Sequence, residues 1–108
     1  MIVHLLLFRP RASLTAEERS ALLDSFATAV REIPSVRRAQ VGRRVTHGRP
    51  YEQMMRSDYP FAALLEFDDV AALEAYFEHP AHEQLASRFF AAAEEMLIYD
   101  CEIVGADL

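Results

Sequence analysis

The sequence predicts an α+β fold with the element order βαββαβ, in which a four-stranded antiparallel sheet carries helices on one face. Three observations lead to this prediction. The chain has 108 residues, which fits one domain spanning residues 1–108. Four apolar segments have the length and composition of strands. Between them, two regions repeat apolar residues at helical spacing.

The first half of the chain predicts a strand, a helix and a second strand. Residues 2–8 form a continuous apolar run, typical of a strand that is covered on both faces. Thr15 and Glu18 match a capping box at the start of a helix, and Pro34 ends the helical repeat. Residues 36–46 are expected to form the second strand, with Gly42 at a bulge or bend.

The second half predicts a long loop, a third strand, a broken helical region and a last strand. Residues 47–60 lack a period and are expected to be a loop with a short helical turn within residues 51–56. Residues 61–67 read as a strand, and Asp68 or Asp69 can cap the helix that follows. That helix is expected to break at His79-Pro80, with a further helix over residues 81–96 and a strand over residues 97–104.

The strands are too apolar for either face of the sheet to meet water. Helices cover one face, so a second copy of the chain is expected to cover the other, with two sheets packed face to face in a homodimer. On one parity of the third and fourth strands stand Glu66, Asp100 and Glu102. We expect these carboxylates to meet arginines of the second strand across that interface.

Charge and composition exclude several classes of partner. The net charge is −6 and every basic residue is arginine, so nucleic acid and anionic membranes are not expected partners. The single cysteine, Cys101, forms no internal disulfide. The apolar run at residues 2–8 is too short to span a bilayer and lacks the features of a signal peptide. A cytoplasmic location is therefore expected.

The segment around residues 75–82 holds the main chemical candidates. His82 shares a helical stripe with Leu85 and Phe89, so its ring is expected to face inward. One interpretation is a structural histidine that bonds a backbone carbonyl. The other is a general base, because desolvation favours the neutral imidazole. Both remain open at this point.

Three further residues are candidates with weaker support. Tyr76 carries a hydroxyl at the apolar edge of its helix, where it can hold a ligand oxygen or reach water. His4 joins these residues only if its face of the first strand is turned toward the helices, which periodicity does not decide. His79 is expected to cap a helix. The spacing His79-x-x-His82 resembles a metal pair, but no third ligand is evident and no metal site is expected.

Several segments resemble the stress-responsive α/β-barrel (Dabb) family. They are residues 1–8, 41–43, 64–67, 72–76, 79–82 and 99–100. The resemblance implies a ferredoxin-like protomer and a homodimer whose two sheets form a barrel. Some plant members are polyketide cyclases that need neither metal nor organic cofactor. Their catalytic histidine corresponds to His82, their assisting tyrosine to Tyr76, and two further pocket positions to His4 and to Phe26, where those cyclases carry a tyrosine.

We therefore expect an apolar pocket for a small hydrophobic or aromatic molecule, with no cofactor. In an enzyme of this kind His82 would remove a proton beside a carbonyl, Tyr76 would bind the enolate oxygen and His4 would orient one of them. Alternatives are a non-catalytic ligand-binding or stress-response dimer, a cofactor-free monooxygenase, and a structural module whose pocket is filled by side chains. The residues expected to line the pocket are Leu6, Phe26, His79, Leu85 and Phe89.

Overall fold

A computed structural model describes residues 1–106 and has the predicted order of elements. The strands and helices are β1 (Ile2–Pro10), α1 (Ala16–Glu32), β2 (Arg38–Arg43), α2 (Pro50–Met54), β3 (Phe61–Phe67), α3 (Val70–Glu78), α4 (Pro80–Ala92) and β4 (Ala93–Glu102). The four strands form one antiparallel sheet in the order β2-β3-β1-β4. The α+β, ferredoxin-like fold is confirmed.

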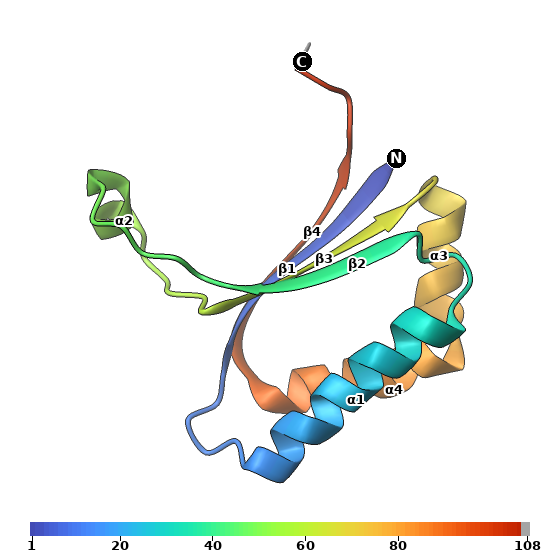
Figure 1. Cartoon of the computed structure of the whole chain (residues 1–108), viewed down its shortest axis with the longest axis horizontal. Helices are drawn as coiled ribbons and strands as arrows, with labels where there is room; N and C mark the ends of the chain where they lie inside the picture. The colour runs from blue at the N-terminus through green and yellow to red at the C-terminus, as the bar shows by residue number, and fades with distance from the viewer. Residues whose placement is uncertain (107–108) are drawn as a thin grey trace.

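The helices α1, α3 and α4 lie on one face of the sheet and leave the other face open (Figure 1). β1 is central and pairs with β3 on one side and β4 on the other. Its register places His4 opposite Leu65 and Asp100. His4 is only 4% exposed, so the face of β1 that carries it is turned toward the helices. Periodicity alone did not decide this.

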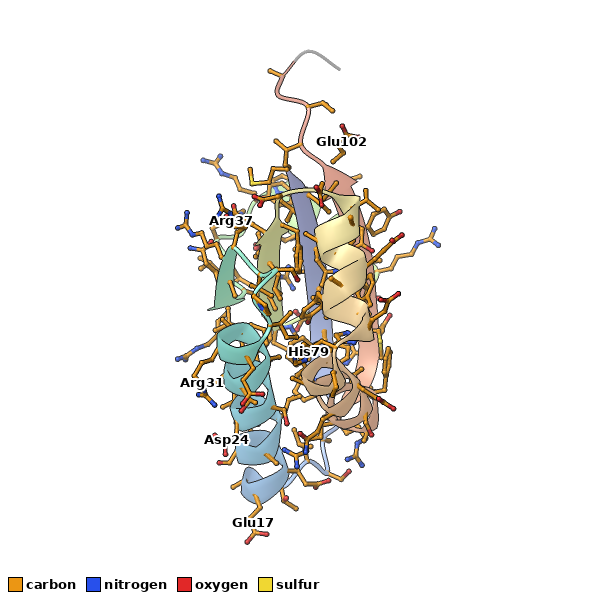
Figure 2. The ribbon with its side chains drawn as sticks, turned by 90° about the vertical axis from the view of Figure 1, so that its right-hand side faces the viewer. Glu17, Asp24, Arg31, Arg37, His79 and Glu102 are labelled. Atoms are coloured by element: carbon orange, nitrogen blue, oxygen red, sulfur yellow. The ribbon has the colours of Figure 1, made fainter. Side chains whose placement is uncertain are left out.

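Capping residues stabilise the ends of the helices, and one arginine joins two helices by hydrogen bonds. Thr15 accepts from the backbone N–H of Glu18, whose side chain accepts from the Thr15 N–H, so the predicted capping box is present. Arg88 on α4 donates to the backbone oxygen of Ala21 and to the buried hydroxyl of Ser25 on α1. α1 and α4 therefore lie side by side over the sheet (Figure 2).

Two predicted boundaries and one predicted bulge are wrong. The last helix ends at Ala92 and β4 begins at Ala93, so Met96 lies on a strand opposite Phe8 and not on the helical stripe. β2 is shorter than expected, and its pairing with β3 is regular through Gly42. The irregularity falls instead between Arg9 and Pro10 on β1, because proline has no N–H to donate to the neighbouring strand.

The expectation that Glu66, Asp100 and Glu102 share one face of the sheet is also wrong. Glu66 pairs with Val3, whereas Asp100 pairs with His4 and Glu102 with Ile2. Neighbouring residues of a strand point to opposite faces, so Asp100 turns toward the helices and Glu66 away from them. Sequence parity alone could not give this result, because it depends on how β4 is aligned with β1.

The open face of the sheet is apolar. Val3, Leu5 and Leu7 on β1 have the parity opposite to that of His4, and Leu5 pairs with Leu64 and Tyr99. Leu64, Leu97 and Tyr99 are exposed although they are large and hydrophobic.

The segment between β2 and β3 forms an arm that extends beyond the body of the protein (Figure 1). It contains α2 at the place of the predicted helical turn. Arg44 pairs with Asp58 across the base of the arm, and Glu52 accepts from the backbone N–H groups of His47 and Gly48. Across residues 1–106, no helix is both long and apolar enough to cross a membrane.

Candidate active site

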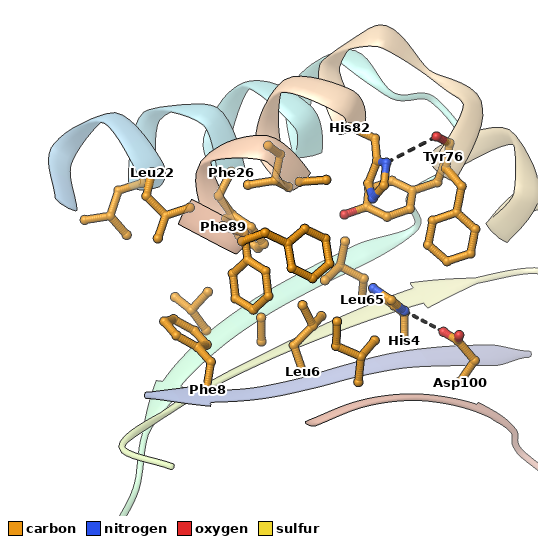
Figure 3. A pocket seen from close by; sticks show the side chains of 18 residues that line it. His4, Leu6, Phe8, Leu22, Phe26, Leu65, Tyr76, His82, Phe89 and Asp100 are labelled. Carbon is orange, nitrogen blue, oxygen red and sulfur yellow. Dashed lines mark hydrogen bonds and ion pairs between the residues drawn. The ribbon is translucent and has the colours of Figure 1, made fainter. Parts of the chain in front are cut away.

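A cavity of about 230 Å³ lies between the sheet and the helices. Strands form its floor and α1, α3 and α4 its roof (Figure 3). The residues that line it are His4, Leu6, Phe8, Leu22, Leu23, Phe26, Val41, Ala63, Leu65, Tyr76, Phe77, His82, Leu85, Ala86, Phe89, Phe90, Ile98 and Asp100.

Tyr76 on α3 places a phenol in the wall of this cavity. Its side chain packs against Phe67 and Phe77, and the residue is 2% exposed. Burial raises the pKa of Tyr76 to about 12, so the hydroxyl keeps its proton at neutral pH. The hydroxyl points into the cavity (Figure 3), and none of the hydrogen bonds found among residues 1–106 involves it. Tyr76 therefore presents to the cavity a donor without a protein partner.

His82 on α4 lies beside Tyr76, with 4.6 Å between the ring centroids. Its Nδ1 is 3.2 Å from the backbone oxygen of Phe77. A carbonyl oxygen only accepts, so Nδ1 carries the proton and Nε2 has a free lone pair. Burial is the main cause that lowers the pKa of His82, and the Phe77 carbonyl opposes it. The ring is thus neutral at neutral pH and presents a base to the cavity.

His4 faces these two groups from the floor of the cavity. Its ring centroid is 5.9 Å from that of Tyr76. Its Nδ1 is 2.5 Å from Oδ1 of Asp100 on the adjacent strand. The carboxylate accepts the Nδ1 proton, which leaves Nε2 on the cavity side of the ring. Asp100 therefore fixes both the orientation and the tautomer of His4.

The cavity has one polar end. His4, Tyr76, His82 and Asp100 lie together at one end (Figure 3). The opposite end is made of aliphatic and aromatic side chains, including Leu22, Phe8, Phe26 and Phe89.

Of the residues singled out from the sequence, His4, Leu6, Phe26, Tyr76, His82, Leu85 and Phe89 lie around this one cavity. His79 does not line it, which corrects that expectation. Its Nδ1 accepts from the backbone N–H of Ala81, so the side chain is used to cap α4 at the junction with α3 (Figure 2). One ring nitrogen of His82 bonds a backbone carbonyl, as the structural interpretation expects, and the other faces the cavity, so the general-base interpretation stays a prediction.

Sequence reasoning did not identify Asp100 as part of the site. His4 and Asp100 are 96 positions apart, so only the alignment of β1 with β4 could have brought them together in a prediction. Phe77 was also missed in both of its roles, as a wall of the cavity and as the carbonyl that orients His82. Within residues 1–106, no three His, Cys, Asp or Glu side chains are grouped so that they could hold a metal ion.

Comparison with protein families gives a match over almost the whole chain. Residues 2–103 match the family described as Stress responsive A/B Barrel Domain. No curated protein matches this sequence.

Solved structures share the fold at low sequence identity. A hydroxynitrile lyase from Passiflora edulis has a TM-score of 0.82 at 17% identity, covering 99% of this chain and 95% of that one. A dimeric ferredoxin-like protein of unknown function from Thermobifida fusca has a TM-score of 0.73 at 18% identity, with 94% and 90% covered. A mutant of SnoaB, a cofactor-independent oxygenase from Streptomyces nogalater, has a TM-score of 0.69 at 14% identity, with 98% and 95% covered. Lyase and oxygenase activities therefore both occur on this fold.

Proposed function

The chain belongs to the Stress responsive A/B Barrel Domain family, and we propose that it is a cofactor-independent enzyme that moves a proton on a carbon next to a carbonyl group. Its substrate is a small, partly aromatic molecule held in the cavity. Because relatives on this fold carry different activities, the proposal rests on the side chains of the site and not on the fold.

The observation that carries the proposal is the pairing of Tyr76 with His82. The two rings touch, the phenol is a neutral donor without a partner, and the imidazole is a neutral base with a free Nε2. A carbonyl oxygen that accepts from Tyr76 brings its neighbouring carbon close to His82. Enolisation requires a hydrogen-bond donor for the oxygen and a base for the proton, and these two side chains supply them.

In the proposed step, Nε2 of His82 takes a proton from the carbon beside the carbonyl. The electron pair of that C–H bond becomes a C=C bond, and the carbonyl π pair moves onto oxygen, where the Tyr76 hydroxyl stabilises the enolate. In a β,γ-unsaturated substrate the imidazolium then returns its proton to the γ-carbon of the dienolate, which isomerises the substrate. Alternatively, the enolate carbon adds to a second carbonyl carbon and forms a C–C bond, and the imidazolium protonates the alkoxide that results. No electron leaves the substrate, so the step needs no oxidant or reductant.

His4 has a positioning and polarising role in this scheme. Asp100 holds its Nδ1 proton, so Nε2 faces the same end of the cavity as Tyr76 and His82. A second imidazole at that point can orient the substrate oxygen or exchange a proton with it. Asp100 acts through His4 and is a positioning residue.

We also infer that the protein is a homodimer formed through the open face of the sheet. The support is the row of apolar side chains on that face, which an isolated protomer would expose to water, and the dimeric state named for a protein of the same fold. Leu5 lies near the middle of the face, between Leu64 and Tyr99. A Leu5→Glu variant should elute as a monomer in gel filtration with light scattering. A wild-type protein that runs as a monomer would contradict the inference.

The chemistry is tested by hydrogen–deuterium exchange at the acetyl methyl group of 4-methylacetophenone in D2O, followed by NMR. The wild-type protein should accelerate exchange, and His82→Ala should abolish the acceleration. The matched control is His79→Asn, because His79 lies outside the cavity and asparagine also caps helices. If the wild-type protein binds the ketone without accelerating exchange, the protein is a ligand-binding module and the enzymatic proposal is wrong.

A further inference from the structure

We infer that this pocket selects an uncharged molecule with a single oxygen function at one end of an apolar body about one ring in size. The inference rests on the proposed function, since it takes the Tyr76 end of the cavity as the place where the oxygen is bound. It goes further by excluding molecules with several oxygen functions and molecules with a carboxylate or phosphate.

The first argument is size. A closed apolar cavity of about 150 Å³ is enough to hold benzene. The cavity here, of about 230 Å³, has room for one ring with short substituents. It is smaller than the roughly 300–1,000 Å³ of sites that hold drug-sized ligands. The cavity opens to solvent beside Leu23, Val41 and Phe90, which are more than half exposed, so a two-ring compound or a long chain would extend out of it.

The second argument is that polar groups stand at one end only. His4, Tyr76 and His82 surround that end, and a ligand oxygen there can find a donor. At the opposite end Leu22, Phe26 and Phe89 offer neither donor nor acceptor. An oxygen buried there would lose its hydrogen bonds to water without replacement. A molecule with carbonyl groups along its length is therefore a poor fit.

The third argument is charge. The lining contains one carboxylate, that of Asp100, and no arginine side chain, and the sequence has no lysine. Burying an anion without a cation to pair with it is costly, and a nearby carboxylate adds repulsion. A ligand that is ionised at neutral pH is thus disfavoured at either end of the cavity.

Phe26 is one of the side chains that leave the apolar end without a hydrogen-bonding group. It is partly buried on α1 and lines the cavity opposite the polar end. A tyrosine at this position would add a hydroxyl to an otherwise apolar wall, and with it a partner for a second oxygen function. The phenylalanine removes that possibility, so we assign it as a specificity-determining residue.

Three probes built on one scaffold test the inference by isothermal titration calorimetry at neutral pH. They are 4-methylacetophenone, 4-hydroxyacetophenone and 4-acetylbenzoate, which keep the same ketone and differ only at the far end of the ring. The methyl compound should bind most tightly. The hydroxyl compound should bind about tenfold more weakly or worse, because its hydroxyl has no partner. The benzoate should bind at least about a hundredfold more weakly.

Two variants at Phe26 test whether the preference comes from the missing hydrogen-bond partner or from the general fit of the ligand. Phe26→Tyr should reduce the preference for the methyl over the hydroxyl compound severalfold. Phe26→Leu is the matched control, since it keeps the wall apolar and should keep the preference. Circular dichroism of each variant checks that the fold is retained, and a change of preference in the leucine variant would remove Phe26 from its assigned role.

The Tyr76→Phe variant distinguishes failure of this inference from failure of the proposed function. It should lower the affinity for all three probes by a similar factor and leave the preference among them unchanged. Tight binding of 4-hydroxyacetophenone or 4-acetylbenzoate to the wild-type protein would overturn the inference but leave the role of Tyr76 intact. If Tyr76→Phe instead binds every probe as well as the wild type does, the proposed site of oxygen binding is wrong.

Discussion

Filling the cavity with a larger side chain should stabilise the protein. Ala63 lies on β3, is buried, and has its side chain directed into the cavity, where it neighbours Leu6 on β1. Replacing it with leucine adds three carbon atoms at a place that holds no protein atoms. In a filled core the same change would force side chains out of their preferred rotamers and destabilise the fold.

The magnitude follows from the apolar area that the new atoms bury. At about 0.8 kcal/mol for each buried carbon group, the leucine gains about 2.4 kcal/mol. Fixing its side chain costs about 0.5–1 kcal/mol in entropy. The expected net increase in the free energy of unfolding is therefore about 1.5 kcal/mol. The same variant should lose affinity for 4-methylacetophenone, because the space that the ring needs is taken.

Urea unfolding at one fixed protein concentration measures this change, since the stability of a dimer depends on concentration. The control is Ala29→Leu. Ala29 is fully buried on α1 and does not line the cavity, so leucine there should destabilise the protein by about 1–3 kcal/mol. If Ala63→Leu destabilises the protein as much as Ala29→Leu does, the space beneath the helices is not open and the site has to be abandoned.

Three further predictions concern other parts of the chain. Burial lowers the pKa of His82 below its ordinary value of 6.5, so the unfolded state takes up this proton first as the pH falls. The stability that neutral His82 contributes is fully present above about pH 6.5 and should decline below it. In urea unfolding measured across this range, His82→Ala should lack that part of the decline. Thr15→Ala removes the capping oxygen of α1 and should lower the free energy of unfolding by about 1 kcal/mol, while Thr15→Ser should retain it. Gly48 has a φ of 80°, so Gly48→Ala should cost about 1–2 kcal/mol in the arm, detected as faster amide exchange there; Gly42→Ala, which meets no atom within 4 Å, serves as the control and should leave exchange unchanged.

The order of the elements could be predicted from the sequence because it depends on local patterns. The capping residues, the helical repeats and the apolar strands each act over a few positions, and the structure confirms them. The boundary between α4 and β4 could not be placed, since Ala91-Ala92-Ala93 and the carboxylates after them favour a helix by their local propensity. Pairing with β1 favours the strand from Ala93 onward.

The same distinction between local patterns and long-range pairing applies to the residues of the candidate site. Tyr76 and His82 could be selected from helical periodicity, because each lies on the buried face of its own helix. Asp100 could not be selected, because its partner His4 is on another strand and the alignment of the two strands is a property of the whole sheet. The expected clustering of Glu66 with Asp100 and Glu102 failed for the same reason.

The pairing of His4 with Asp100 also determines when the site can exist during synthesis. β1 leaves the ribosome before β4, because His4 precedes Asp100 by 96 positions. Until β4 docks, one edge of β1 is unpaired and the His4 ring has no carboxylate to fix it. Contacts of such long range slow folding, because the chain must close a large loop before they form. The pocket is therefore incomplete until β4 pairs with β1, and ligand binding reports completion of the sheet.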